Sequence, residues 1–228
     1  MMLSRGSLQL HYEVSGEGRP LLMLHGNGED MSIFARSLPL LEKHFRVCRI
    51  DTRGHGGSSA ASTLHYSDIA EDAYALISFL DLRKPVVYGF SDGGIAALIL
   101  AYTHPDAIDA IAVSGANTSP KGLKLGYRAL YSALNAVKKD EKLSLMLREP
   151  HITAEDLGKI AVPALVIAGE RDAVKLSDTR FIASSIPRSR LMILPGESHG
   201  SYIIGSEKIG RILIEAFDDG YTLQSPLL

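Results

Sequence analysis

Short apolar runs alternate along this chain with longer segments that carry apolar residues on one side. The runs cover residues 8–14, 21–24, 45–50, 86–90, 110–114, 164–168 and 190–194. The first run alternates apolar and polar positions, as a strand with one buried face does. The later runs are almost continuously apolar, which is typical of strands that helices cover on both faces. The pattern therefore predicts a largely parallel sheet.

The segments between these runs have the period of amphipathic helices. We expect helices over residues 67–82, 93–104, 176–186 and 206–217. Ser67 is a plausible N-cap for the first, with Asp68 in its first turn, and the second stops before Pro105. Strands that alternate with helices indicate right-handed crossovers in an α/β fold, with any functional site beyond the carboxyl ends of the strands.

Residues 115–160 break this alternation, because they contain apolar positions at helical spacing and no strand pattern. The segment holds eight Lys or Arg and five Asp or Glu residues, so its net charge is +3 in a chain whose net charge is −2. An ordinary pair of surface helices with a solvated basic face would have this spacing and charge. A helical cap inserted over a site would too, and we favour the cap because the flanking strands carry the candidate chemistry.

Composition narrows the class of protein. The chain has 228 residues, of which 46% are hydrophobic and 22% charged, as expected for a single globular domain over residues 1–228. No long run of like charge occurs, so neither nucleic acid nor membrane is expected as a partner. The single cysteine, Cys48, lies in an apolar run and is expected in the core. With no apolar leader and no membrane-spanning stretch, a soluble cytoplasmic protein is expected.

The segment around Ser91 reads as strand, tight turn and helix. Gly89 and Gly93 stand two residues to either side of Ser91, giving the pattern G-x-S-x-G. Side chains at the glycine positions would collide with neighbouring backbone in so sharp a turn, and the serine would project above the sheet. A glycine-rich loop with an incidental serine is the plainer interpretation, but the strand before and the Ala-rich helix after it favour a nucleophile.

A serine nucleophile needs a base and a group that orients the base. His199 follows the last predicted strand, on the same side of the sheet as Ser91, and is the preferred base among eight histidines. Asp172 follows the strand before it and is the preferred acid over Glu170, although Asp172 could instead cap the next helix. The order Ser, Asp, His is the one this architecture uses.

Two backbone N–H donors are needed to stabilise an oxyanion. The first is expected from Asp92, directly after the serine. The second is expected from Asn27 in the glycine-rich turn over residues 25–28, which could also be a plain turn.

These separated motifs together resemble the α/β-hydrolase superfamily. The resemblance rests on residues 25–28, 51–58, 89–93 and 169–172 and on His199, and it covers nearly the whole chain. It implies an eight-stranded, mostly parallel sheet with flanking helices, a cap before the strand at 164–168, a Ser91–Asp172–His199 triad and an oxyanion hole from the Asn27 and Asp92 amides. It also implies a structural role for residues 53–58, so His55 is not expected to be catalytic.

Residues 89–98 look most like those of the biphenyl hydrolase-like (valacyclovir hydrolase-type) esterases. The cap, about forty-five residues long, is shorter than in many relatives, so the substrate is not carried over. The Asp92 carboxylate could attract a substrate ammonium or point away and cap its helix. Tyr127 and Tyr131, one helical turn apart, could line an acyl pocket or simply pack against a core.

The function expected from these residues is hydrolysis of a small or medium ester, lactone, amide or thioester through an acyl-enzyme on Ser91. No metal-binding, phosphate-binding or dinucleotide-binding motif occurs, so no cofactor is expected. Two alternatives use the same residues. One is hydrolysis of a C–C bond, and the other is a small-molecule receptor with slow turnover. The oligomeric state is left open.

Overall fold

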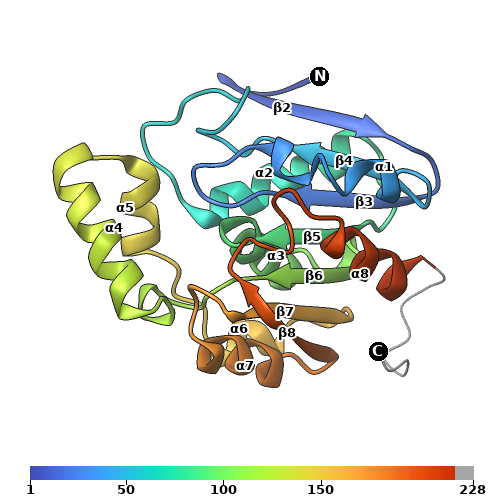
Figure 1. Cartoon of the computed structure of the whole chain (residues 1–228). Coiled ribbons are helices and arrows are strands. Elements are labelled where there is room, and N and C mark those ends of the chain that lie inside the picture. Colours follow the sequence, from blue (N-terminus) through green and yellow to red (C-terminus); the bar gives the residue numbers. More distant parts are fainter. Residues whose placement is uncertain (219–228) are drawn as a thin grey trace.

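The strands form one twisted sheet in the order β1-β2-β4-β3-β5-β6-β7-β8 (Figure 1). The computed structural model describes residues 1–218. The strands are β1 (Met2–Arg5), β2 (Leu8–Ser15), β3 (Arg19–Leu24), β4 (Phe45–Ile50), β5 (Val86–Phe90), β6 (Ala110–Ser114), β7 (Ala164–Arg171) and β8 (Ser189–Ser198). Strands β3 to β8 pair in parallel, whereas β1 and β2 add an antiparallel edge. The eight-stranded, mostly parallel sheet is confirmed.

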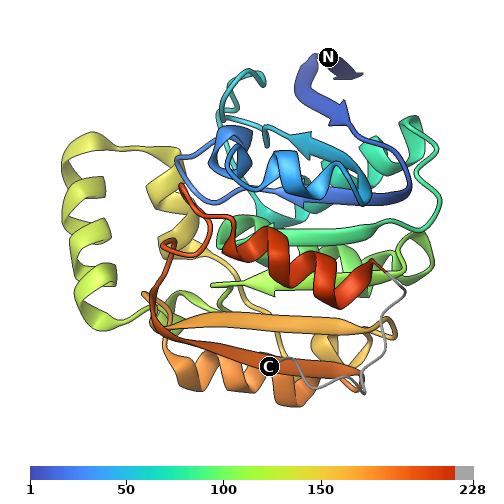
Figure 2. The same cartoon turned by 45° about the vertical axis from the view of Figure 1, so that its right-hand side comes forward.

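Helices cover both faces of this sheet. The helices α2 (Tyr66–Phe79), α3 (Asp92–Thr103), α6 (Ala154–Gly158) and α7 (Leu176–Ser185) share one apolar cluster with one face. The helices α1 (Leu38–Leu41) and α8 (Lys208–Phe217) share a second cluster with the other face (Figure 2). All five residues of β5 and all five of β6 are buried, which explains their almost continuously apolar sequence.

The predicted helix boundaries differ from the structure at the start of α2. The helix begins at Tyr66 with His65 in the N-cap position, so Ser67 is not the cap. Instead, Glu149 of the inserted segment accepts from Tyr66 N–H, the first amide of the helix, at 3.2 Å, and Glu141 accepts from Leu64 N–H, just before the helix, at 3.1 Å. Free N–H groups at a helix start attract anions, so this contact ties the insertion to the sheet domain.

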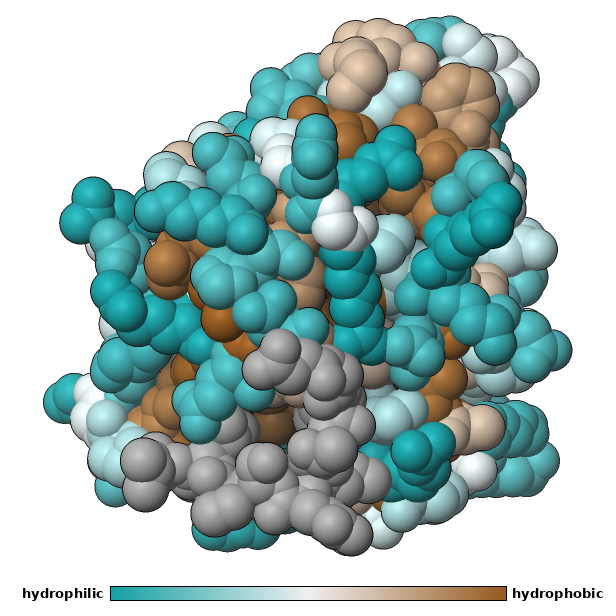
Figure 3. All heavy atoms as spheres, turned by 90° about the vertical axis from the view of Figure 1, so that its right-hand side faces the viewer, coloured by the Kyte–Doolittle hydropathy of each residue, from teal (hydrophilic) through white to brown (hydrophobic). Residues whose placement is uncertain are grey.

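The insertion lies between β6 and β7. Its helices α4 (Leu125–Lys138) and α5 (Glu141–Arg148) stand out to one side of the sheet, whereas α6 packs beside α7 (Figure 1). No side chain of α4 is fully buried. The opposite side of the molecule, seen in Figure 3, presents mostly hydrophilic residues. No helix within residues 1–218 is both long enough and apolar enough to cross a bilayer.

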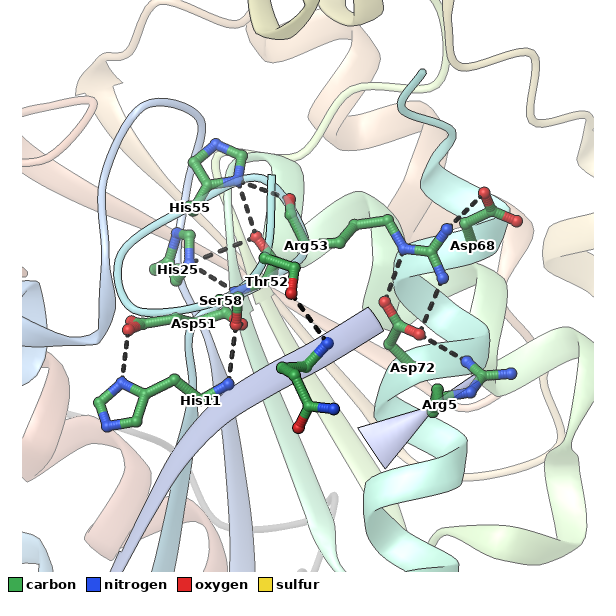
Figure 4. Close-up of polar contacts among 12 residues, drawn as sticks. Arg5, His11, His25, Asp51, Thr52, Arg53, His55, Ser58, Asp68 and Asp72 are labelled. Carbon is green, nitrogen blue, oxygen red and sulfur yellow. Dashed lines mark hydrogen bonds and ion pairs between the residues drawn. The ribbon is translucent and has the colours of Figure 1, made fainter. Parts of the chain in front are cut away.

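A buried ion-pair cluster fixes the antiparallel edge to α2 (Figure 4). Asp72 on α2 is 1% exposed and accepts from Arg5 of β1 at 2.5 Å. It also accepts from Arg53 Nε at 2.6 Å and from Arg53 Nη2 at 2.8 Å. Arg53 reaches the more exposed Asp68 on the same helix at 2.6 Å. One carboxylate thus joins β1 and the loop after β4 to α2.

Replacing Asp72 by Asn should lower the free energy of unfolding by about 3 kcal/mol, because two guanidinium groups lose their shared buried partner. Asp68→Asn is the matched control. It removes a carboxylate from the same arginine at an exposed position and should cost less than about 1 kcal/mol. Urea unfolding curves of the two variants measure the difference, and equal costs would contradict the structural role given to Asp72.

Candidate active site

Ser91 sits at the apex of the turn that joins β5 to α3. Its backbone lies at φ +52° and ψ −114°, a conformation that is costly for a residue with a side chain. A Cβ atom on Gly89 would collide with the backbone of Gly93, and one on Gly93 would collide with the carbonyl oxygens of Leu24 and His25. The two glycines are therefore required by the close approach of strand, helix and neighbouring loop, as the sequence pattern predicts.

The structure brings Ser91, His199 and Asp172 into one hydrogen-bonded row. His199, in the loop after β8, places Nε2 3.1 Å from Ser91 Oγ and Nδ1 2.6 Å from Asp172 Oδ1. The three side chains come from loops at the carboxyl ends of β5, β7 and β8. Glu170, the rival acid, is engaged elsewhere, because its carboxylate accepts from Gly196 N–H at 2.8 Å.

Asp172 is 0% exposed, and both oxygens of its carboxylate accept hydrogen bonds. Its carboxylate accepts from the backbone N–H of Val174 at 2.9 Å and of Gly169 at 3.3 Å, in addition to His199. Burial favours the neutral acid, but the hydrogen bonds from His199 and from the two backbone amides outweigh it and hold the pKa of Asp172 below its ordinary value. A charged Asp172 keeps a proton on His199 Nδ1, so Nε2 faces Ser91 as an acceptor.

Several backbone amides near Ser91 have no hydrogen-bond partner among residues 1–218, and two of them are the amides expected from the sequence. These two belong to Asn27, in the turn after β3, and to Asp92, the first residue of α3. The turn lies against the nucleophile, since a Cβ atom on Gly26 would come within 3.2 Å of Ser91 Cβ. Free N–H groups on both sides of a nucleophile are the arrangement that an oxyanion hole needs.

The Asp92 side chain takes neither of the two positions expected from the sequence. It is 5% exposed, does not line the pocket and makes no helix-capping bond. Its carboxylate accepts from Asn27 Nδ2 at 2.7 Å and from Tyr66 Oη at 2.9 Å. Burial raises the pKa of Asp92 to about 6. The carboxylate therefore fastens the turn that carries one free amide to the helix that carries the other.

A pocket of about 470 Å³ opens above Ser91 and His199. The sheet domain supplies its floor, and α4, α5 and the link between them supply its other wall. Tyr131 lines the pocket, whereas Tyr127 is 42% exposed and is not among the lining residues; its ring centroid lies 6.4 Å from that of Tyr131. The lining residues are Asn27, Gly28, Glu29, Phe90, Ser91, Tyr131, Leu134, Lys138, Asp140, Lys142, Leu143, Met146 and His199.

Glu29 is a pocket residue that the sequence analysis missed. Its Oε2 accepts from Gly26 N–H at 3.0 Å, and burial raises the pKa of its carboxyl group. The only sequence signal is its position directly after the turn at residues 25–28, which does not reveal that the side chain folds back over the turn. Within the described residues, no group of three His, Cys, Asp or Glu side chains is placed to hold a metal ion.

Comparison with known proteins identifies the class. A family model described as the alpha/beta hydrolase fold matches residues 19–135, just over half of the chain. The protein therefore belongs to the α/β-hydrolase fold family and is a hydrolase, as the sequence motifs predict.

Its relatives include the human serine hydrolase BPHL, which is 28% identical over 237 residues, covering 90% of this chain and 81% of that protein. The enol-lactonase from Burkholderia xenovorans LB400 has the same fold, with a TM-score of 0.78 and 24% identity over 94% of this chain and 98% of that one. So does a meta-cleavage product hydrolase from Pseudomonas fluorescens IP01, with a TM-score of 0.80 and 20% identity over 96% and 97% of the two chains.

The buried Asp92 carboxylate should make the protein less stable as pH rises. The pKa of Asp92 is raised from 3.8 to about 6 on folding, so the native state binds more protons than the unfolded state between these values. The stabilisation is complete below about pH 4 and should be lost by about pH 7, a change of about 2–3 kcal/mol. The unfolding free energy of the wild type minus that of Asp92→Asn, followed against pH, measures it. A difference that does not change with pH would contradict this role.

Proposed function

We propose that this protein is a serine hydrolase that cleaves a small or medium carboxylic ester or lactone through an acyl-enzyme on Ser91. The observation that carries the proposal is the row of hydrogen bonds from buried Asp172 through His199 to Ser91. Such a row is the arrangement that turns a weakly nucleophilic hydroxyl into an effective nucleophile. The similarity to a serine hydrolase along most of the chain supports the same conclusion.

In the proposed reaction His199 Nε2 removes the Ser91 proton as Oγ attacks the acyl carbonyl carbon. Asp172 stabilises the imidazolium that forms, and the Asn27 and Asp92 amides donate to the oxyanion of the tetrahedral intermediate. Collapse of the intermediate breaks the acyl–oxygen bond, and His199 returns the proton to the leaving alcohol. Water then attacks the acyl-enzyme by the same route, which restores Ser91 and releases the acid.

The pocket supports a substrate of modest size. Its volume of about 470 Å³ lies near the low end of small-molecule sites, and its walls mix apolar side chains with charged ones. Phe90, Leu143 and Met146 offer apolar contact for an acyl chain. The proposed partner is accordingly a small acyl compound rather than a nucleic acid or a membrane, and location in the cytoplasm stays a prediction.

Hydrolysis of a C–C bond and slow-turnover ligand binding would both use this pocket. The row from Asp172 to Ser91, with free amides beside it, is complete without any contribution from the ligand, which favours catalysis over slow-turnover binding. A receptor would bind a ligand tightly with almost no turnover, so ester kinetics separate an esterase from a receptor.

Wild-type protein should hydrolyse short p-nitrophenyl esters and should be labelled by a fluorophosphonate at Ser91. Ser91→Ala should lose the label and about 10⁶-fold in kcat, because the acyl-enzyme cannot form. Ser114→Ala serves as the control, since the buried Ser114 hydroxyl is hydrogen-bonded to Tyr88 at 2.8 Å and not to His199, and it should keep the label. A wild type that is neither labelled nor active on any ester of the series would refute the proposed function.

Asp172→Asn should reduce kcat by about 10⁴-fold with little change in KM, because His199 loses the partner that keeps its proton on Nδ1. Glu170→Gln is the matched control, two residues away and bonded to Gly196 instead, and it should change kcat by less than about threefold. Steady-state kinetics on one ester measure both variants. If Glu170→Gln were the more damaging change, the acid would be wrongly assigned.

A further inference from the structure

Side chains hold three backbone groups of the turn after β3, on both sides of the Asn27 amide. Gly26 N–H donates to Glu29, Gly26 C=O accepts from His25 Nδ1 at 2.7 Å, and Gly28 N–H donates to His55 Nε2 at 3.1 Å. Gly28 has φ +70°, a conformation that glycine adopts without strain. The proposed oxyanion donor, the Asn27 amide, thus lies between two amides that side chains hold.

His25 controls the direction of that amide. The carbonyl of Gly26 and the N–H of Asn27 belong to one planar, trans peptide group, so they point in opposite directions. A carbonyl can only accept, so His25 Nδ1 carries the proton in this bond. Its other nitrogen, Nε2, is left as the acceptor for the backbone N–H of Thr52 at 3.0 Å. The Thr52 amide therefore selects the tautomer of His25 that holds the Gly26 carbonyl.

His55 fixes the next peptide group in the same way. Figure 4 shows its contacts with Thr52 and Arg53. Because Nε2 accepts from Gly28 N–H, the proton lies on Nδ1, which faces the carbonyl of Arg53 at 3.0 Å and the hydroxyl of Thr52 at 3.1 Å. The same hydroxyl lies 3.3 Å from His25 Nε2, so Thr52 connects the two rings. The ring centroids are 5.1 Å apart, and each side chain is less than 5% exposed.

The surroundings of both rings favour the neutral form of the imidazole. Burial lowers the pKa of His25, and burial together with the neighbouring His25 lowers the pKa of His55 to about 4. The charges of Lys142 and Asp140 in the cap act on His55 in opposite directions. A protonated ring would lose the lone pair on Nε2 that receives the backbone N–H.

From this network we infer that His55, together with His25, is a positioning residue: as neutral Nδ1–H tautomers, the two rings hold the turn so that the Asn27 amide points at the reacting carbonyl oxygen. This inference rests on the proposed function, since the amide matters only if an oxyanion forms there. Neither histidine lines the pocket, and neither is hydrogen-bonded to Ser91. Their effect is carried by the Gly26 carbonyl and the Gly28 amide.

The test compares two replacements of His55. Leu removes the acceptor for Gly28 N–H, and kcat for p-nitrophenyl butyrate should fall about 10²-fold with KM within about twofold, because a displaced donor is lost mainly in the transition state. Gln can offer its amide oxygen to the same N–H and should restore kcat to within about fivefold of wild type. His11→Gln is the control: it changes a histidine of the same polar cluster that bonds to Asp51 and not to the turn, and should leave kcat unchanged.

A second measurement does not depend on activity. The ¹⁵N NMR signals of the His55 ring in the wild-type protein should show a neutral ring with the proton on Nδ1 at pH 7. A proton on Nε2, or a charged ring, would overturn the inference even if the protein hydrolyses no ester. Unchanged kcat in a folded His55→Leu variant, or a Gln variant as impaired as the Leu variant, would overturn it as well. Absence of all esterase activity with the expected tautomer would instead count against the proposed function.

Discussion

The hydrogen bond between the Asp172 carboxylate and His199 Nδ1 sets the chemistry of the whole site. Asp172 is completely buried, so its charge persists only because two backbone amides and the imidazole stabilise it. That charge fixes the proton of His199 on the nitrogen away from Ser91. The nucleophile in turn depends on a strained backbone turn that only glycines at positions 89 and 93 permit.

The buried Asp92 side chain joins parts of the structure that lie far apart in the sequence. Through Asn27 and Tyr66 it connects the turn after β3, the start of α3 and the start of α2. Asn27 Nδ2 also donates to the carbonyl of Lys142 in the cap at 3.0 Å, and cap carboxylates bind the amides at the start of α2. The cap is therefore fixed to the same groups that are proposed to stabilise the oxyanion, which places its pocket residues relative to Ser91.

The sequence predicts most of the fold and the core of the site, because both depend on local patterns. Continuous apolar runs identified the parallel strands, and G-x-S-x-G marked the turn at Ser91 since its glycines are a steric requirement. The short edge strand β1 was missed because four residues carry too little periodicity. The N-cap predicted for α2, Ser67, is wrong because the helix begins one residue earlier, where Glu149 from the distant insertion accepts from its first amide. The position of Asp92 and the pocket role of Glu29 depend on where side chains point, which a linear pattern does not contain.

Trapping the covalent intermediate tests most directly whether Ser91 is the nucleophile. Rapid quenching of the wild-type protein with p-nitrophenyl acetate, followed by peptide mass spectrometry, should find one acetyl group, on Ser91 and in an amount close to one per protein. An acetyl group found only on lysines or on another serine, or no acetyl group while nitrophenol is still released, would show that the reaction does not pass through the row formed by Asp172, His199 and Ser91.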